Sequence, residues 1–189
     1  MKEIITPEFR VSYPNLFEPR GFDGSKPKYS VVMLFDKTTD ISELKKLAQE
    51  VVLEKYPDGN VPKGLHNPFR DGDEEKGHID GYSNVIFVRA ATERRPHVYD
   101  RNLKDIMDTE DIYAGCYARA KVNPYWFDAK VKKGITFGLI SIQKTRDGDR
   151  FGSGTADPLA GFTDLGGSVT TLEDEDPSFN DKATGNMFD

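Results

Sequence analysis

The stretch that decides the fold runs from Tyr113 to Phe127 and reads YAGCYARAKVNPYWF. Successive side chains of a β-strand point to opposite faces. One face of this stretch therefore carries the small and apolar residues Ala114, Cys116, Ala118, Ala120 and Val122. The other face carries Tyr113, Gly115, Tyr117, Arg119, Lys121, Asn123 and Tyr125. This alternation predicts a long strand with one face in the core and a basic, aromatic face outside.

An outer face of this kind suits a single strand of nucleic acid. Aromatic rings are stacking platforms for unpaired bases, worth about 1–3 kcal/mol per base, and Arg and Lys neutralise phosphates. The same residues are also common on the solvated face of an antiparallel sheet, so the pattern alone leaves both interpretations open. Trp126 is a weaker stacking candidate, because its parity assigns it to the core side of the strand.

Cations in the neighbouring segments favour the nucleic-acid interpretation. Cationic loops beside a cationic sheet face form a groove, and a groove is what a flexible strand needs. Arg89 lies in the predicted strand Asn84–Ala91, and the hairpin after Phe127 is rich in lysine. We therefore predict that these residues bind nucleic acid: Tyr113, Tyr117, Arg119, Lys121, Tyr125, Trp126, Arg89, Arg94, Arg95, Lys130, Lys132, Lys133 and Arg70.

Further strands are predicted on both sides of this region. Phe9, Val11 and Tyr13 alternate with polar residues until Pro14-Asn15 interrupts them. Tyr29–Phe35 is short, apolar and rich in β-branched residues, which is typical of a buried strand. Ile135–Lys144 is the last predicted strand, and Asp147-Gly148 follows it as a turn.

One helix is predicted, over Asp40–Tyr56. Asp40 is suited to the N-cap, with Glu43 three residues later, and Pro57 follows the end. Asp58–Gly81 reads as a loop that is longer than structureless connections usually are. The charged segment Glu93–Asp111 is expected to hold at most a turn of helix.

The acidic residues gather at the C-terminal end. The last 17 residues hold six acids and one base, which leaves 26 acids and 25 bases in the other 172 residues. The body is therefore close to neutral although the formal net charge is −6. Residues 156–189 are poor in apolar side chains, and we expect them to form a disordered acidic tail behind a domain of residues 1–155. The aromatics Phe179 and Phe188, with the terminal Asp189, are candidates for docking a partner protein.

Several classes of protein are disfavoured by the sequence. No apolar run is long enough to span a membrane, and Met1–Ile5 is no secretory signal. The single Cys116 cannot form an internal disulfide, which fits a reducing cytoplasm. No nucleophile elbow, Walker loop or dinucleotide fingerprint occurs, so we expect no catalysis and no cofactor. A zinc site and a magnesium-dependent nuclease remain minor alternatives, resting on His66, His78, His97 and Cys116, and on Asp71, Asp73, Glu74 and Glu75.

Four segments carry a resemblance to a known family. Asn67–Asp73, Gly115–Ala120, Asn123–Asp128 and Gly134–Gly148, in this order, resemble a phage-encoded family of OB-fold single-stranded DNA-binding proteins. The resemblance covers nearly the whole of residues 1–155. It implies an OB-fold-like five-stranded antiparallel barrel with one packed helix that coats single-stranded DNA, without sequence preference, during phage replication or recombination in the host cytoplasm.

A more distant similarity concerns the replication single-strand binders of short-tailed phages. It implies a tail that recruits replication or recombination proteins and competes with DNA. Phe188 is followed here by Asp189, so the terminal residue is not aromatic as it is in that group. The predicted helix also follows the second predicted strand, whereas the usual OB order has it after the third.

Two other functions stay open. One is a protein-interaction module without nucleic acid, and the other is a single-stranded RNA binder, because stacking and phosphate contacts serve either backbone. The sequence leaves the oligomeric state open, a homodimer included.

Overall fold

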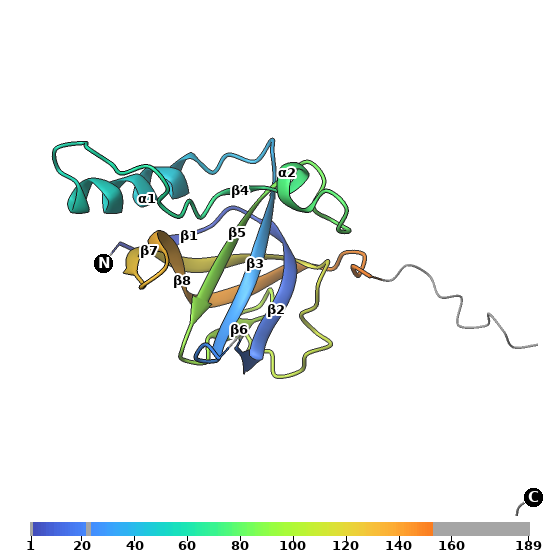
Figure 1. Cartoon of the computed structure of the whole chain (residues 1–189). Helices are drawn as coiled ribbons and strands as arrows, with labels where there is room; N and C mark the ends of the chain where they lie inside the picture. The colour runs from blue at the N-terminus through green and yellow to red at the C-terminus, as the bar shows by residue number, and fades with distance from the viewer. Residues whose placement is uncertain (1, 22–23, 153–189) are drawn as a thin grey trace, which may run out of the picture. The chain divides into compact units, whose positions relative to one another are not determined.

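Five strands of the computed structural model, which describes residues 2–21 and 24–152, close into a ring (Figure 1). They are β2 (Phe9–Arg20), β3 (Lys28–Asp36), β5 (Val85–Thr92), β7 (Tyr117–Asp128) and β8 (Lys133–Arg146). β2 pairs with β3, β3 with β5, β5 with β8, β8 with β7, and β7 again with β2. The predicted five-stranded barrel of the OB type is confirmed.

One pairing in the ring departs from the prediction. β5 and β8 run parallel, with Ala90 opposite Phe137 and Ala91 opposite Gly138. A closed ring with an odd number of strands cannot be antiparallel at every step, so a fully antiparallel barrel of five strands was not attainable.

Alternation along the strands fills the barrel with apolar side chains. Cys116, Ala118, Ala120 and Val122 are all buried, as their parity predicted. The rings of Phe9 and Phe35 meet edge to face inside, with their centroids 5.6 Å apart. Small residues on β7 therefore leave room for the aromatic rings that other strands contribute.

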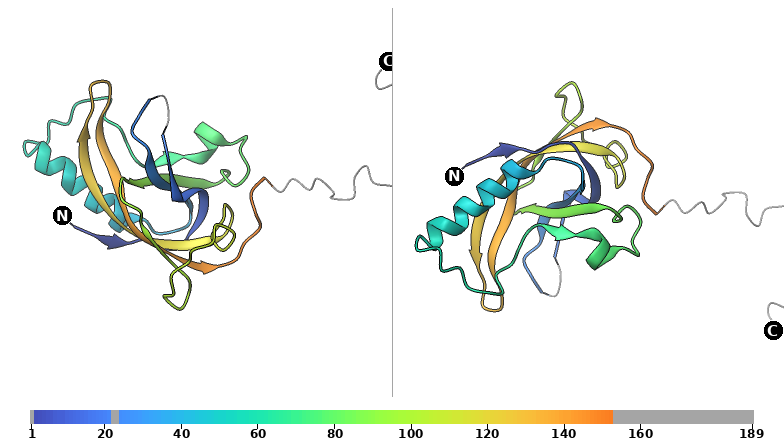
Figure 2. Two further views of the ribbon diagram at one scale, coloured as in Figure 1. Left: turned by 90° about the horizontal axis from the view of Figure 1, so that it is seen from below. Right: turned by 90° about the horizontal axis from the view of Figure 1, so that it is seen from above.

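Helix α1 (Ser42–Lys55) lies across β7 and β8 on one side of the barrel (Figure 2). It buries Leu44, Ala48 and Val52, which belong to one face of a helix. The N-cap residue is Ile41, so the N-cap predicted at Asp40 is one residue too early. The Asp40 carboxylate nevertheless accepts from the backbone N–H of Ser42, the first helical residue, at 2.9 Å. The helix follows the second barrel strand, as predicted.

The predicted loop Asp58–Gly81 is wrong in part, because it contains strand β4 (Arg70–Asp71) and helix α2 (Gly72–Lys76). Both are too short to produce a hydrophobic period. They are held instead by a second, smaller core on the outer face of β3 and β5, which contains Val32, Leu34, Tyr82, Val85 and Phe87, with Ile79 packed against it. The described residues therefore contain two helices rather than the one predicted.

Two short strands and an irregularity in β2 complete the comparison with the sequence. β1 (Ile4–Ile5) pairs with β7, and β6 (His97–Tyr99) pairs in parallel with β8. A strand thus replaces the turn of helix expected in Glu93–Asp111. β2 continues past Pro14-Asn15 with shifts of register, and Tyr13 adopts a φ of 45° there.

The strand predicted from Tyr113 begins only at Tyr117. Gly115 has a φ of 108°, and a Cβ at this position would lie 2.0 Å from the carbonyl oxygen of Asp149, so the chain turns there. Further along, the pairing of β7 with β8 shifts in register between Lys121 and Val122, because β8 has one residue more at that point. Asn123 is buried, although its parity placed it outside, and its amide lies against Gly138 of β8, where a Cβ would come within 2.6 Å of Oδ1.

Neither helix in the described part of the chain combines the length and apolar character that crossing a membrane requires. The predicted tail, with Phe179, Phe188 and Asp189, lies outside the described residues. The domain boundary at residue 155 therefore stays a prediction.

Candidate nucleic-acid interface

A cleft of about 290 Å³ opens on the outside of the barrel over β5 and β8. We call it the cationic cleft, and its lining residues are His66, Pro68, Arg70, Phe87, Arg89, Lys132 and Thr136. Three of them are permanent cations and none is acidic. The set combines side chains from β4, β5, β8, the β7–β8 hairpin and the segment before β4, so it exists only in the folded chain.

Strand register explains why Arg89 lies at the centre of this surface. Its neighbours Val88 and Ala90 are fully buried, so the Arg89 side chain points outward. Val32 is its partner on β3, and the parallel pairing of Ala90 with Phe137 puts Thr136 on its other side. Thr136 in turn pairs with Tyr125 on β7. Arg89, Thr136 and Tyr125 therefore form one row across three strands of the barrel.

Arg70 is held at the edge of the cleft by β4. It pairs with Phe87 of β5, and its guanidinium lies over the Phe87 ring at 4.9 Å from the centroid. The Glu75 carboxylate accepts from Arg70 Nε at 2.9 Å and from Nη2. This side-on contact fixes the plane of the guanidinium and leaves other N–H groups of Arg70 to donate.

The cations predicted from the sequence fall into two groups. Within residues 2–21 and 24–152, the following have no carboxylate at ion-pair distance: Arg89, Arg94, Arg95, Arg119, Lys130, Lys132 and Lys133. Lys121, by contrast, pairs with Glu3 at 2.6 Å. A cation without a carboxylate partner neutralises a phosphate directly, so the first group is better suited to bind a polyanion. Arg70 is paired with Glu75 but keeps N–H groups that can donate to a phosphate.

Most of the other cations of the first group lie in two connections or directly beside them. Lys130 and Lys132 belong to the hairpin between β7 and β8, and Lys133 begins β8. Within the hairpin, Ala129 and Lys132 exchange backbone hydrogen bonds of 3.0 and 3.2 Å. Arg94 and Arg95 follow β5, and Arg95 lies over the Phe17 ring at 5.5 Å. Glu93 holds this turn to the β2–β3 hairpin through Lys26 at 2.5 Å.

The two tyrosines at the start of the predicted strand lie elsewhere. The Tyr113 hydroxyl donates to Asp147 at 3.0 Å, and the Arg150 guanidinium lies 4.1 Å from its ring centroid. The Tyr117 ring is covered by the Arg146 guanidinium at 3.4 Å, and Arg146 is paired with Glu8 at 2.9 Å. A base could stack on that face of Tyr117 only after displacing Arg146.

Arg119 and Lys121 lie beside a shallow hollow of about 200 Å³ on the outside of β7 and β8, with Ile5, Tyr99 and Leu103. Arg119 Nε donates to the Gln143 side chain at 2.9 Å. The structure therefore does not bring these two cations to the cationic cleft.

Tyr125 and Trp126 point to opposite sides of β7. Tyr125 is half-buried in the row with Arg89, and its burial raises the pKa of its hydroxyl, with Glu93 raising it further. Trp126 packs against the core and meets the Tyr56 ring of the helix end edge to face, at 5.7 Å. The Trp126 side chain thus lies on the core side of β7, as its place in the alternation predicted, and it is not available to a base on the outer face.

Sequence reasoning missed His66, Phe87 and Thr136. Thr136 had a signal, since it alternates with the buried Ile135 and Phe137. Phe87 looked like a core residue, which it is, although of the outer core. His66 had no local signal, because its position depends on a backbone pairing with Gly134 across the end of the barrel.

Several residues named for the zinc site and for the magnesium-dependent nuclease have other contacts in the structure. Lys37 lies between Asp71 and Asp73, with Nζ at 2.8 and 2.7 Å from their carboxylates, and lowers the pKa of both. Glu75 is paired with Arg70. Cys116 is buried in the barrel, which raises the pKa of its thiol.

His66 is the titratable group through which the cleft responds to pH. Burial lowers the pKa of its imidazole, and the nearby charges of Lys132 and Arg70 lower it further. The unfolded chain has the ordinary pKa of about 6.5 and so takes up a proton at higher pH than the folded chain does. The contribution of His66 to the free energy of unfolding is therefore complete above about pH 6.5 and falls as the pH drops below it.

When the pH is lowered from about 7.5 to 5.5, the free energy of unfolding should fall less for His66→Gln than for the native chain. Urea unfolding at the two pH values measures this difference. The exposed His78→Gln is the matched control and should follow the native chain. Equal pH dependence of all three proteins would contradict the assignment.

Comparisons with known proteins agree with this architecture. Residues 2–175 match the family model described as Enterobacter phage Enc34, ssDNA-binding protein. A relative, the putative protein p50 of Acyrthosiphon pisum secondary endosymbiont phage 1, is 34% identical over 168 residues, which are 82% of this chain and 90% of that protein.

Solved structures give the same result. The single-stranded DNA-binding protein from bacteriophage Enc34 in complex with ssDNA has a TM-score of 0.67 and 27% identity, over 79% of this chain and 89% of that one. gp2.5, a single-stranded DNA-binding protein encoded by bacteriophage T7, shares the fold with a TM-score of 0.56 and 16% identity, over 90% and 99% of the two chains. The resemblance read from the sequence is thus confirmed, and the chain belongs to the family of the Enterobacter phage Enc34 ssDNA-binding protein.

Proposed function

We propose that the chain binds single-stranded DNA without sequence preference and acts, in the host cytoplasm, in the replication or recombination of phage DNA. The observation that carries the proposal is the cationic cleft, whose Arg89 and Lys132 have no carboxylate partner among the described residues. OB barrels bind oligonucleotides on the face of their second and third strands and with the loops beside it. The second and third barrel strands here are β3 and β5, and Arg89 lies on β5.

Phosphates are the first part of the proposed contact. Arg70, Arg89 and Lys132 converge on one cleft, and Lys130 and Lys133 extend it along the hairpin. Arg94 and Arg95 continue the cationic path past the other end of β5. Arg is suited to this role because its planar fork presents several N–H donors to one phosphate.

Bases are the second part. Tyr125 lies in the same row as Arg89 and Thr136, so its ring is the aromatic surface that a base next to a phosphate on Arg89 would meet. Tyr113, Tyr117, Arg119 and Lys121 are proposed as secondary contacts for a longer strand, since most of them first have to release a partner. The proposal contains no catalytic step and no cofactor.

The affinity for oligo-dT is expected to exceed the affinity for duplex of the same length. Unpaired bases are free to stack, whereas duplex offers phosphates alone. Three phosphate contacts in the cleft give a log–log salt slope of about −2, from about −0.7 per contact. Fluorescence anisotropy over a salt series measures both quantities. Equally weak binding of oligo-dT and duplex at low salt would refute the proposal, and tighter binding of an RNA oligomer would redirect it to RNA.

Arg89→Ala should weaken oligo-dT binding about three- to tenfold, because a charged hydrogen bond to phosphate contributes about 1 kcal/mol or more. It should also make the salt slope shallower by about 0.7. Lys46→Ala is the matched control, since Lys46 is exposed on α1 and lines neither the cationic cleft nor the hollow beside β7, and it should change the affinity less than about twofold. A larger loss with Lys121→Ala than with Arg89→Ala would move the main contact from the cleft to the outer face of β7.

The acidic tail is proposed to compete with DNA and to recruit replication or recombination proteins. Deleting Glu173–Asp189 removes six acidic residues and one lysine. The deletion should tighten oligo-dT binding, and more so at low salt, where charge interactions are screened less. The same anisotropy titration tests it, and unchanged or weaker binding would speak against competition.

A further inference from the structure

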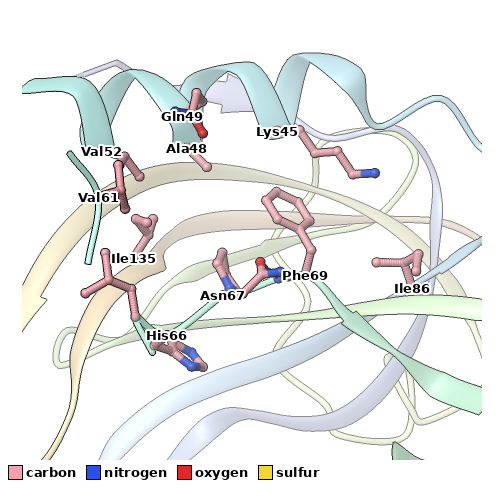
Figure 3. A pocket seen from close by; sticks show the side chains of 12 residues that line it. Lys45, Ala48, Gln49, Val52, Val61, His66, Asn67, Phe69, Ile86 and Ile135 are labelled. Atoms are coloured by element: carbon pink, nitrogen blue, oxygen red, sulfur yellow. Dashed lines mark hydrogen bonds between the residues drawn. The ribbon is translucent and has the colours of Figure 1, made fainter. Parts of the chain in front are cut away.

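A second cavity lies next to the cationic cleft, between helix α1 and the segment that leads to β4 (Figure 3). It has a volume of about 600 Å³, within the range of about 300–1,000 Å³ that is usual for sites of small organic ligands. We call it the helix pocket. Ala48 and Val52 of α1 form one wall, and Val61, Phe69 and Ile135 form the others.

Aromatic and polar groups both reach this pocket. The Phe69 ring meets Phe137 of the barrel edge to face at 5.7 Å and points toward α1 (Figure 3). The Asn67 side-chain oxygen accepts from the Phe69 backbone N–H at 3.0 Å, which fixes the amide and leaves its NH₂ group to donate. Gln49, exposed on α1, presents a second amide at the rim. A flat apolar surface flanked by amides matches a nucleobase, which has apolar faces and a polar edge.

Two residues separate the helix pocket from the cationic cleft. His66 and Pro68 line both cavities, so their segment is a ridge with the pocket on one side and the cleft on the other. The His66 ring is held on this ridge by an edge-to-face contact with Phe127, at 5.6 Å. The two sides differ in chemistry, because the cleft presents Arg70, Arg89 and Lys132 whereas most of the pocket wall is apolar. A nucleotide has the same division, with an anionic phosphate next to a largely apolar base.

We infer that the helix pocket receives one nucleobase of the strand whose phosphates lie in the cationic cleft. The inference rests on the proposed function and adds to it a base-binding site away from the outer barrel face. Because His66 and Pro68 line both cavities, the pocket lies within reach of a strand held in the cleft, and the occupant that fits is a base of that same strand. Hydrogen bonds from Asn67 and Gln49 to the base edge would give a preference among bases at this one position.

Val61→Trp tests the site by filling it. Val61 lies in a loop and is 40% exposed, so the larger side chain can enter the pocket without disturbing a strand. Met107→Trp is the matched control, because Met107 is 71% exposed outside the helices and strands and lines neither cavity. Val61→Trp should weaken the binding of oligo-dT about fivefold or more, the loss expected for one stacked base. It should leave the binding of an abasic oligomer of the same length unchanged.

A second measurement needs no variant. Thymidine alone, added to the full-length native chain, should shift the backbone NMR signals of Asn67, Phe69 and Gln49 in a saturable way. Thermal unfolding of both tryptophan variants checks that each is folded.

The outcomes separate the inference from the proposed function. Equal oligo-dT affinity of Val61→Trp and Met107→Trp, or an equal loss for oligo-dT and the abasic oligomer, overturns the base pocket and leaves single-strand binding intact. Absence of oligo-dT binding by the native chain overturns both. If thymidine shifts nothing, while deletion of Glu173–Asp189 shifts these same signals, the tail occupies the pocket and the inference is wrong.

Discussion

The parallel pairing of β5 with β8 is the constraint on which the barrel and its surface both depend. Ala90 and Phe137 meet inside the barrel, and both are fully buried. A methyl group opposite a phenyl ring lets the two strands approach, and a larger residue at position 90 would overpack the core. The residues just before this pair, Arg89 and Thr136, are outside by alternation. The packing of the core therefore also determines which side chains become neighbours on the outer face.

The long segment between α1 and β5 depends on a different set of contacts. Ile79 and Tyr82 pack on the outer face of β3 and β5, and the Tyr82 hydroxyl is 3.0 Å from the Ser12 hydroxyl. The ion pairs of Lys37 are largely exposed and contribute little on their own. Apolar burial thus holds the segment in place, and Arg70 is positioned over Phe87 as a result. This explains how a charged, glycine-rich stretch supplies an ordered wall of the cleft.

The sequence predicts the core of the fold well where buried and exposed residues alternate along a strand with a period of two. Ala118, Ala120 and Val122 follow that period and are buried as expected. The prediction fails at Asn123, because the contact of its amide with Gly138 is set by β8 and leaves no mark in β7 itself. It fails at Tyr113 because the turn at Gly115 depends on the close approach of Asp149.

The sequence identified candidate cations one at a time, but it did not show which of them lie together in the folded chain. Arg70, Arg89 and Lys132 lie far apart in the sequence, and only strand register brings them to one cleft. Lys121 has the same local pattern as Arg89, yet Glu3 pairs with it from the N-terminal strand region. Whether a cation is free or paired is a long-range property, so residue type and parity cannot supply it.

The position of the single tryptophan has a practical consequence. Trp126 packs under the end of α1 against Tyr56, and its indole N–H is buried without a hydrogen-bond partner among the residues described. Its fluorescence should therefore resemble that of an indole in an apolar solvent and should report the docking of α1 on the barrel. A change in emission when a ligand is added would signal movement of the helix, and an unchanged emission would be compatible with full occupancy of the outer face.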